Sequence, residues 1–223
     1  MKMFSKMTKG SQGLILAACL SALPQMVCAA SSESSMANSS NLKIVPTLGY
    51  SYFNIQGSSS DYKSKGGNSV AVLAQMPMGG SVELESGLEY LETGAKQSVD
   101  FGFLSLDTLT VTIKQLTVPL RAKYIFNPSS SGTRWYGKGG VTPTFVMSAS
   151  ADVPGAGSTD IKSDLNSFGI FAQAGLGADW GLESIGGRVN LDVTYSQGLT
   201  KVFKEDSGRA AGFQIAAGYA FSL

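Results

Sequence analysis

Residues 68–93 read NSVAVLAQMPMGGSVELESGLEYLET, two runs in which apolar residues recur with a period of two. In the second run, valine, leucine and tyrosine alternate with Glu83, Glu85 and Glu89. Because successive side chains of a strand point to opposite faces, this period predicts β-strands with one apolar and one polar face. Only Gly79 and Gly80 separate the two runs, so we expect them to pair as antiparallel neighbours.

The same alternation marks eight segments of the chain, and convincing helical periodicity is absent. The predicted strands cover residues 42–54, 68–78, 81–93, 110–127, 134–149, 166–180, 187–198 and 210–223. Short connections alternate with longer ones, which are 55–67, 94–109, 150–165 and the intermediate 199–209. This order predicts an all-β fold, an up-and-down antiparallel β-barrel that most simply has eight strands. A ten-stranded barrel that uses part of 95–109 is the structural alternative.

The direction of the apolar faces separates a membrane barrel from a soluble lipocalin-type barrel, which has the same alternation with its apolar set inside. Aromatic residues fall in two groups on the apolar faces, one near the long connections and one near the short ones: Tyr52, Tyr90, Phe168, Tyr195 and Phe213, then Phe126, Trp135, Trp180 and Phe221. Two aromatic rings around an aliphatic band match the two interfaces of a membrane. Only 15% of the residues are charged, which is too few to coat a soluble barrel. We therefore expect a transmembrane barrel in the outer membrane of a Gram-negative bacterium.

The N-terminal segment has the pattern of a secretory signal peptide. Three lysines precede an uncharged stretch over 13–23, and Val27-Cys28-Ala29 follows. We expect residues 1–30 to be removed by cleavage after Ala29 or Ala30. A lipoprotein signal with Cys19 as the acylated residue is the alternative. Residues 31–41 are predicted to be a disordered Ser-rich spacer, and 42–223 form the barrel.

The parity of each strand places ten charged residues inside the barrel. They are Lys43, Arg121, Lys123, Lys138 and Arg188 together with Glu83, Glu85, Glu89, Asp179 and Asp192. An eight-stranded barrel is just wide enough for side chains to fill it, so these charges need partners. Because Glu83, Glu85 and Glu89 lie on the strand next to Arg121 and Lys123, we expect ion pairs that plug the interior.

Some residues conflict with regular strands. Pro46, Pro119 and Pro143 each remove a backbone donor inside a predicted strand, so a bulge is expected at each. In the fourth strand, Val111 and Ile113 have odd parity whereas the later apolar residues are even. We expect a bulge near Lys114 or Gln115 to absorb this change of phase, unless 110–114 belongs to the loop.

The last strand ends in Gly218-Tyr219-Ala220-Phe221-Ser222-Leu223. This stretch resembles the C-terminal signal by which the outer-membrane assembly machinery recognises its substrates. The residues that carry the resemblance are Gly218, Tyr219, Phe221 and Leu223. The sequence departs from the pattern in having Ala216 where a polar residue is favoured, and a terminal Leu where Phe is frequent.

Residues 116–126, LTVPLRAKYIF, precede a turn and then Tyr136-Gly137-Lys138-Gly139-Gly140. This combination resembles the outer membrane protein beta-barrel domain family, PorT-like, in which an apolar-acidic-Ile-Pro segment continues into a Lys-Tyr pair. Thr117 stands where that family has an acid. The resemblance covers about 42–223 and implies a small porin-like barrel in the outer membrane rather than one activity.

Composition limits the possible functions. The chain has 17 Lys and Arg against 16 Asp and Glu, so a basic nucleic-acid-binding face is not expected. It has no histidine, which excludes Ser-His-Asp and Cys-His hydrolases. We expect no catalytic residue, cofactor or metal.

The predicted role is a structural or surface-interaction barrel, and a small solute channel is the alternative. Its partners would be outer-membrane lipid, the assembly machinery, and a protein or surface ligand on the long loops. Apolar residues in 99–103 and 202–204 are candidates for protein contact or for lying on the lipid interface.

Overall fold

The computed structural model describes residues 42–56, 62–101, 104–128, 132–153, 157–182, 187–205 and 207–223. Within these ranges, the side chains of 62, 97–101 and 104–108 are not described. The predicted signal peptide and spacer therefore lie outside the described residues and stay predictions. In the described part of the chain, no helix has the length and hydrophobicity needed to cross a membrane.

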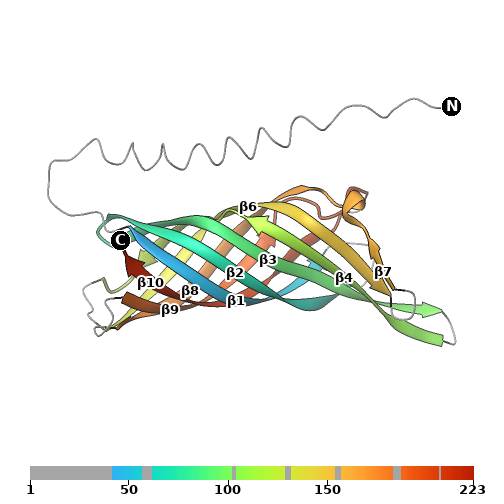
Figure 1. Ribbon diagram of the computed structural model, residues 1–223, viewed down its shortest axis with the longest axis horizontal. Helices are drawn as coiled ribbons and strands as arrows, with labels where there is room; N and C mark the ends of the chain where they lie inside the picture. Colours follow the sequence, from blue (N-terminus) through green and yellow to red (C-terminus); the bar gives the residue numbers. More distant parts are fainter. Residues whose placement is uncertain are drawn as a thin grey trace, which may run out of the picture. The chain divides into compact units, whose positions relative to one another are not determined.

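The strands form one closed antiparallel ring (Figure 1). Their bounds are β1 Lys43–Gln56, β2 Tyr62–Gly79, β3 Val82–Phe101, β4 Leu104–Thr117, β5 Leu120–Ile125, β6 Thr133–Val153, β7 Gly157–Asp160, β8 Phe168–Leu182, β9 Gly187–Gly198 and β10 Arg209–Ser222. Strand β1 pairs with both β2 and β10, which closes the ring. Strands β4 and β5 share one position between β3 and β6, and β7 pairs only with β6. The ring therefore has eight positions, which confirms the predicted eight-stranded barrel, and the ten-stranded alternative is wrong.

The two ends of the barrel differ. One end carries the short β2–β3, β5–β6 and β8–β9 connections and both chain ends of the ring, and we call it the turn side (Figure 1). At the opposite end, the loop side, the strands run farther than predicted. Residues 94–109 are not a loop, because β3 continues to Phe101 and β4 begins at Leu104. Leu104 and Leu106 alternate with polar residues, so the period of two does extend into this hairpin. Residues 150–165 likewise contain the end of β6, the short β7 and a 3-10 turn, η1, over Lys162–Asp164.

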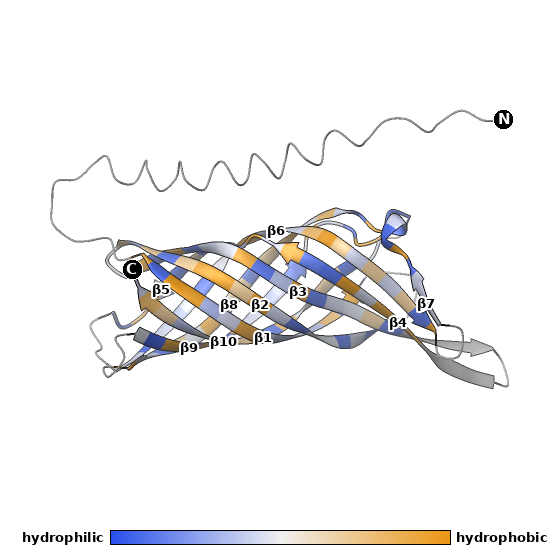
Figure 2. Ribbon diagram, in the orientation of Figure 1, coloured by the Kyte–Doolittle hydropathy of each residue, from blue (hydrophilic) through white to orange (hydrophobic). Residues whose placement is uncertain are grey.

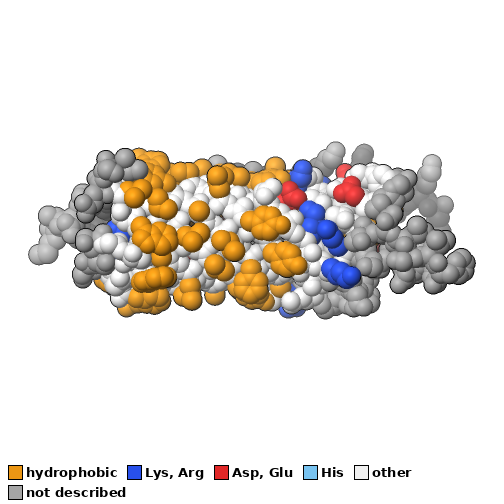
Figure 3. Space-filling view, turned by 90° about the horizontal axis from the view of Figure 1, so that it is seen from below, with side chains coloured by type: hydrophobic (Ala, Val, Ile, Leu, Met, Phe, Trp, Pro, Cys, Tyr) orange, Lys and Arg blue, Asp and Glu red, His pale blue; other side chains and the backbone are white. Residues whose placement is uncertain are grey.

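The apolar faces of the strands point outward and the polar faces line the interior. Leu48 on β1 and Leu176 on β8 expose 67% and 66% of their surface, whereas Glu85 and Arg121 expose 2% and 3%. Hydrophobic and hydrophilic residues alternate along the strands in Figure 2, and apolar side chains cover the wall on the face shown in Figure 3. A soluble barrel of the lipocalin type has the opposite arrangement, so this distribution identifies a barrel whose wall faces lipid.

The three prolines are accommodated without the expected bulges. The register of β1 with β10 is the same on both sides of Pro46. Pro119 and Pro143 lie at one gap in the ladder, where β4 ends, β5 has not begun, and Val118 N donates to Pro143 O over 2.9 Å. The pairing with β6 resumes beyond that gap in unchanged register. Because Pro119 and Pro143 lie at the same gap, the backbone N–H groups that these two prolines lack interrupt the hydrogen-bond ladder at one place only.

The phase of the fourth strand position differs from the prediction. A register shift does occur between Lys114 and Gln115, but the unpaired residue is Met147 on β6, so the bulge belongs to β6. Strand β4 keeps one phase against β3 throughout 109–117. Val111 and Ile113 therefore point inward and are each 3% exposed. The apparent change of phase was a change in the polarity of the interior, which becomes apolar toward the loop side.

Candidate functional site

Arg121 on β5 lies at the centre of a buried ion-pair network. Its Nη1 donates to Glu85 Oε1 over 3.1 Å and its Nη2 donates to Glu89 Oε2 over 3.3 Å, both on β3. Its Nε donates to Gln173 Oε1 on β8 over 2.7 Å. One guanidinium thus joins three positions of the ring across the interior. All of these partners are buried, so the charges face one another with little water between them.

A second centre lies nearer the turn side. Lys123 Nζ is 3.1 Å from Asp179 Oδ2, 3.5 Å from Glu83 Oε2, and 4.0 Å from the centroid of the Tyr136 ring. Asp179 also accepts hydrogen bonds from Arg134 Nε over 2.8 Å and from Arg188 Nε over 2.6 Å. One carboxylate on β8 therefore holds cations from β5, β6 and β9 together.

The remaining contacts extend the network to the whole ring. Lys43 Nζ is 2.5 Å from Glu83 Oε1, and Lys138 Nζ is 2.8 Å from Asp192 Oδ1. Gln214 on β10 donates to Glu89 Oε1 over 2.5 Å, and Gln75 on β2 donates to Glu85 Oε2 over 2.8 Å. Every position of the ring thus contributes a side chain. We call the charged members the lumen network: Lys43, Glu83, Glu85, Glu89, Arg121, Lys123, Arg134, Lys138, Asp179, Arg188 and Asp192.

The structure brings together all five residues that the sequence analysis placed in an interior charge cluster, Glu83, Glu85, Glu89, Arg121 and Lys123. The sequence analysis missed Arg134. The signal was present, because Arg134 precedes Tyr136 and Lys138 by two and four residues and shares their inward parity. Its inclusion brings the network to six cations and five carboxylates among the described residues.

An apolar layer covers the network on the loop side. We call it the apolar cap, and its inward side chains are Phe53, Leu91, Val111, Ile113, Leu165, Phe171 and Val202. The rings of Phe53 and Phe171 meet edge to face at 6.0 Å between centroids. Because water and ions cross an apolar constriction poorly, this layer is a candidate for a second barrier in series with the charged one.

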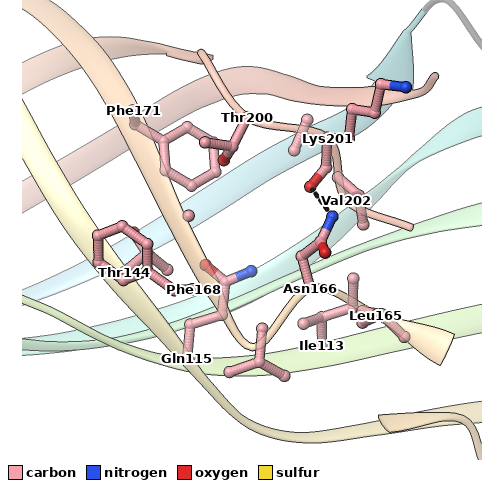
Figure 4. A pocket seen from close by; sticks show the side chains of 13 residues that line it. Ile113, Gln115, Thr144, Leu165, Asn166, Phe168, Phe171, Thr200, Lys201 and Val202 are labelled. Atoms are coloured by element: carbon pink, nitrogen blue, oxygen red, sulfur yellow. Dashed lines mark hydrogen bonds between the residues drawn. The ribbon is translucent and has the colours of Figure 1, made fainter. Parts of the chain in front are cut away.

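The β7–β8 connection and the β9–β10 connection are hydrogen-bonded to each other across the loop side, and together they complete the cap. Asn166 Nδ2 donates to Lys201 O over 3.0 Å and to Phe203 O over 3.3 Å (Figure 4). Leu165 and Phe203 form an isolated bridge, and Lys204 N donates to Asp164 O over 3.0 Å. Val202 and Phe203 are partly buried against the cap, whereas Lys204 is exposed. Part of the apolar surface of 202–204 thus packs inside the barrel, and contact with a protein or with lipid stays a prediction. The side chains of 99–101 lie outside the described ones.

A small cavity of about 40 Å³ lies beneath the cap, bordered by Ile113, Gln115, Thr144, Leu165 and Phe171 (Figure 4). At about 10–15 Å³ per water, it holds a few waters at most. Gln115 Nε2 donates to Thr93 Oγ1 over 3.1 Å at this level.

The residues of the predicted assembly signal lie at the turn-side end of β10. Phe221 and Leu223 are outward, 38% and 74% exposed, and Leu223 N donates to Leu42 O over 2.9 Å. Gly218 has no room for a larger residue, because a Cβ there would lie 2.7 Å from Asn190 Oδ1 and 2.8 Å from Pro46 O. A steric requirement of the barrel therefore explains the glycine, and recognition by the assembly machinery stays a prediction.

Comparisons with known proteins agree with this geometry. A family model described as "Outer membrane protein beta-barrel domain" matches residues 29–204. Neisserial surface protein A superposes with a TM-score of 0.51 at 14% identity, over 82% of this chain and 97% of that one. The outer membrane protein OprG from Pseudomonas aeruginosa gives 0.50 at 14% identity, over 82% and 96%. Identity this low shows a shared fold and nothing about function. No curated protein matches the sequence.

Proposed function

Since the chain belongs to the outer membrane protein beta-barrel domain family, we propose that it is an outer-membrane barrel that does not conduct and that acts at the cell surface through its loop side. The observation that carries this proposal is the lumen network, which together with Gln75 on β2 and Gln214 on β10 takes side chains from every position of the ring. Small barrels of eight strands are filled by side chains, whereas diffusion porins have about 16–18 strands.

The interior carboxylates act as structural partners in this proposal. Glu83, Glu85 and Asp179 each lie within ion-pair distance of at least two cations, and Glu89 of Arg121. A general acid or base needs access to a substrate, and the closed interior offers none. We therefore propose that the protein is not an enzyme, and that the network stabilises the barrel and seals it.

The surface role is supported by the extent of the loop side. The β3–β4 hairpin and the β6–β7 hairpin continue past the closed ring (Figure 1). The two connections that close the cap give this side a fixed shape, because backbone and side-chain hydrogen bonds join them. A preformed surface on a rigid barrel loses little conformational freedom on binding a partner.

Planar-bilayer recording of the purified protein tests the proposal. The expected record at neutral pH is a baseline without channel openings, and a reproducible open-channel current would establish the small solute channel instead. Two pairs of substitutions test the two proposed barriers separately. Arg121→Ser with Lys123→Ser disrupts the lumen network, and Phe171→Ser with Val202→Ser disrupts the apolar cap. Because the seals lie in series, each pair alone is expected to stay closed and the combination to conduct.

A matched control removes the same number of charges elsewhere. Lys162 and Lys201 are exposed loop-side lysines outside the network, so Lys162→Ser with Lys201→Ser is expected to stay silent in the wild-type and cap-variant backgrounds. A current in the Arg121→Ser, Lys123→Ser variant alone would mean that the cap does not seal. For the surface role, cells carrying a barrel without residues 98–107 are expected to lose attachment to a host-cell layer, and unchanged attachment would leave a purely structural role.

A further inference from the structure

Four lysines lie on the outward faces of β2, β3 and β4, directly beyond the loop-side end of the apolar band. We call them the basic border: Lys63, Lys65, Lys96 and Lys114. Figure 3 shows Lys and Arg side chains gathered at this end of the band, with acidic ones among them. On β3 the buried side chains from Glu89 to Ala95 belong to odd-numbered residues, so Lys96 points outward, and it is exposed.

The basic border begins directly beyond the group of outward aromatic residues on the loop side. Tyr90 pairs with Leu116 on the outward face, and the next outward pair toward the loop side is Glu92 with Lys114. Lys96 lies four residues farther along β3, opposite Lys63 on β2. At about 3.3 Å per residue and a tilt of about 40°, those four residues span about 10 Å along the membrane normal. The headgroup region adds about 5–8 Å on each side of the hydrocarbon, so Lys114 lies within it and the Lys63–Lys96 pair lies at its outer edge, where long lysine side chains extend toward the headgroups.

Among the described side chains, Lys65 is the one border lysine within ion-pair distance of a carboxylate, with Nζ 2.9 Å from Glu92 Oε1. The same Glu92 lies opposite Lys114, so one carboxylate faces two lysines. Lys63 and Lys96 face each other directly, and like charges in a cross-strand pair are destabilising. Asp152 lies two strands from Lys96, and no ion pair joins the two side chains. An anion between Lys63 and Lys96 would remove the repulsion.

The turn side differs. There, among the side chains that the structure describes, the outward face beside the aromatic residues has no Lys or Arg, because Arg134 and Arg188 turn inward to Asp179. A basic border on one interface only, at headgroup depth, matches an anion that belongs to the leaflet on the loop side. We propose that the basic border binds the phosphate groups of an outer-leaflet lipid headgroup, with Lys63, Lys96 and Lys114 as the phosphate contacts.

The geometry suits a phosphorylated lipid rather than a free anion. Side chains directly opposite in an antiparallel pair have Cβ atoms about 5 Å apart, so two ammonium groups reach one phosphate. Lysine binds phosphate as a point charge, which needs no planar geometry. The acyl chains of the same lipid would pack on the apolar band below, beside Tyr90 and Leu116, which a soluble anion cannot do.

The test measures lipid retained by the full-length barrel in phosphatidylcholine nanodiscs that contain bisphosphorylated lipid A, read by native mass spectrometry. The variant is Lys63→Gln, Lys96→Gln, Lys114→Gln, which leaves the Lys65–Glu92 pair in place. The matched control is Lys162→Gln, Lys201→Gln, Lys204→Gln, which removes three loop-side charges away from this face. Heat-modifiable gel mobility verifies that each variant is folded.

The expected result is a loss of lipid A affinity of about a hundredfold in the border variant, at about fivefold for each of the three lysines near a charged membrane surface. The control is expected to retain wild-type affinity. Dephosphorylated lipid A should bind the wild type as weakly as lipid A binds the border variant, and millimolar inorganic phosphate should not displace the lipid. Equal loss in both variants, undiminished binding of dephosphorylated lipid A, or border-dependent capture of heparin without retention of lipid A would overturn the proposal.

Discussion

Replacement of Arg121 by methionine is expected to destabilise the barrel strongly. Methionine keeps the length of the side chain but removes the charge that faces Glu85 at 3.1 Å and Glu89 at 3.3 Å. Both carboxylates are nearly inaccessible to water, at 2% and 3% exposure, so neither gains hydration to replace the lost partner. Removing one member of a buried ion pair costs about 3–5 kcal/mol, which is more than a hundredfold in the folding equilibrium.

A compensating variant isolates the cause. In Arg121→Met with Glu85→Gln and Glu89→Gln, no uncompensated charge remains at this centre, and the amides still hydrogen-bond to Gln75 and Gln214. Replacing a whole buried ionic cluster by neutral groups is often close to neutral in stability. We therefore expect the triple variant to recover most of the free energy of unfolding that the single variant loses.

Urea unfolding in detergent micelles, followed by tryptophan fluorescence, measures these free energies. Trp135 and Trp180 report the transition well, because both are outward at the turn side and leave the apolar environment on unfolding. Arg209→Met is the matched control, since Arg209 is exposed, and a change within about 0.5 kcal/mol is expected. If Arg121→Met is as stable as Arg209→Met, or if the triple variant is no more stable than the single one, the ion-pair argument fails.

Three further predictions concern substitutions in the strands of the barrel wall. Phe221→Asp with Leu223→Asp is expected to block insertion, measured as surface yield after membrane fractionation, and a normal yield would contradict the assembly role. Val72→Arg places a charge on the lipid face and should cost about 2–4 kcal/mol near the bilayer midplane in the same urea assay, whereas a silent change would argue against lipid contact there. Gly140→Ala should lower stability, because its Cβ would lie 2.1 Å from a backbone carbonyl oxygen of β5, while Gly139→Ala, with 3.5 Å to the nearest atom, should be tolerated. Equal stability of the two alanine variants would contradict that packing.

The parity of the strands was sufficient to predict the ring and its charged interior. Alternation assigns each residue to one of the two faces of its strand. When the aromatic and aliphatic face contacts lipid, the charged residues of the opposite face line the interior. Parity does not give the reach of a long side chain, however. Gln214 meets Glu89 from three positions away in the ring, and Lys138 meets Asp192 across β8, so the partners depend on the closed shape of the barrel.

The loop side was predicted less well because the interior changes polarity there. Val111 and Ile113 look like lipid-facing residues when the interior is assumed to be polar along its whole length. They point inward because segments 161–167 and 199–205 fold over the opening and supply Leu165 and Val202 as apolar partners. The sequence of a single strand cannot show that an apolar residue has such a partner more than fifty residues away along the chain.

The order of layers inside the barrel connects stability with closure. Ion pairs strengthen as the local dielectric constant falls, and water reaching Arg121 from the loop side would weaken its bonds to Glu85 and Glu89. The cap excludes that water, and Gln115, Thr142 and Gln173 form a hydrogen-bonded layer between the cap and the charges. Polar side chains therefore separate the apolar cap from the charged groups. We therefore expect this interior to be most stable when it is closed, which supports the proposal of a barrel that does not conduct.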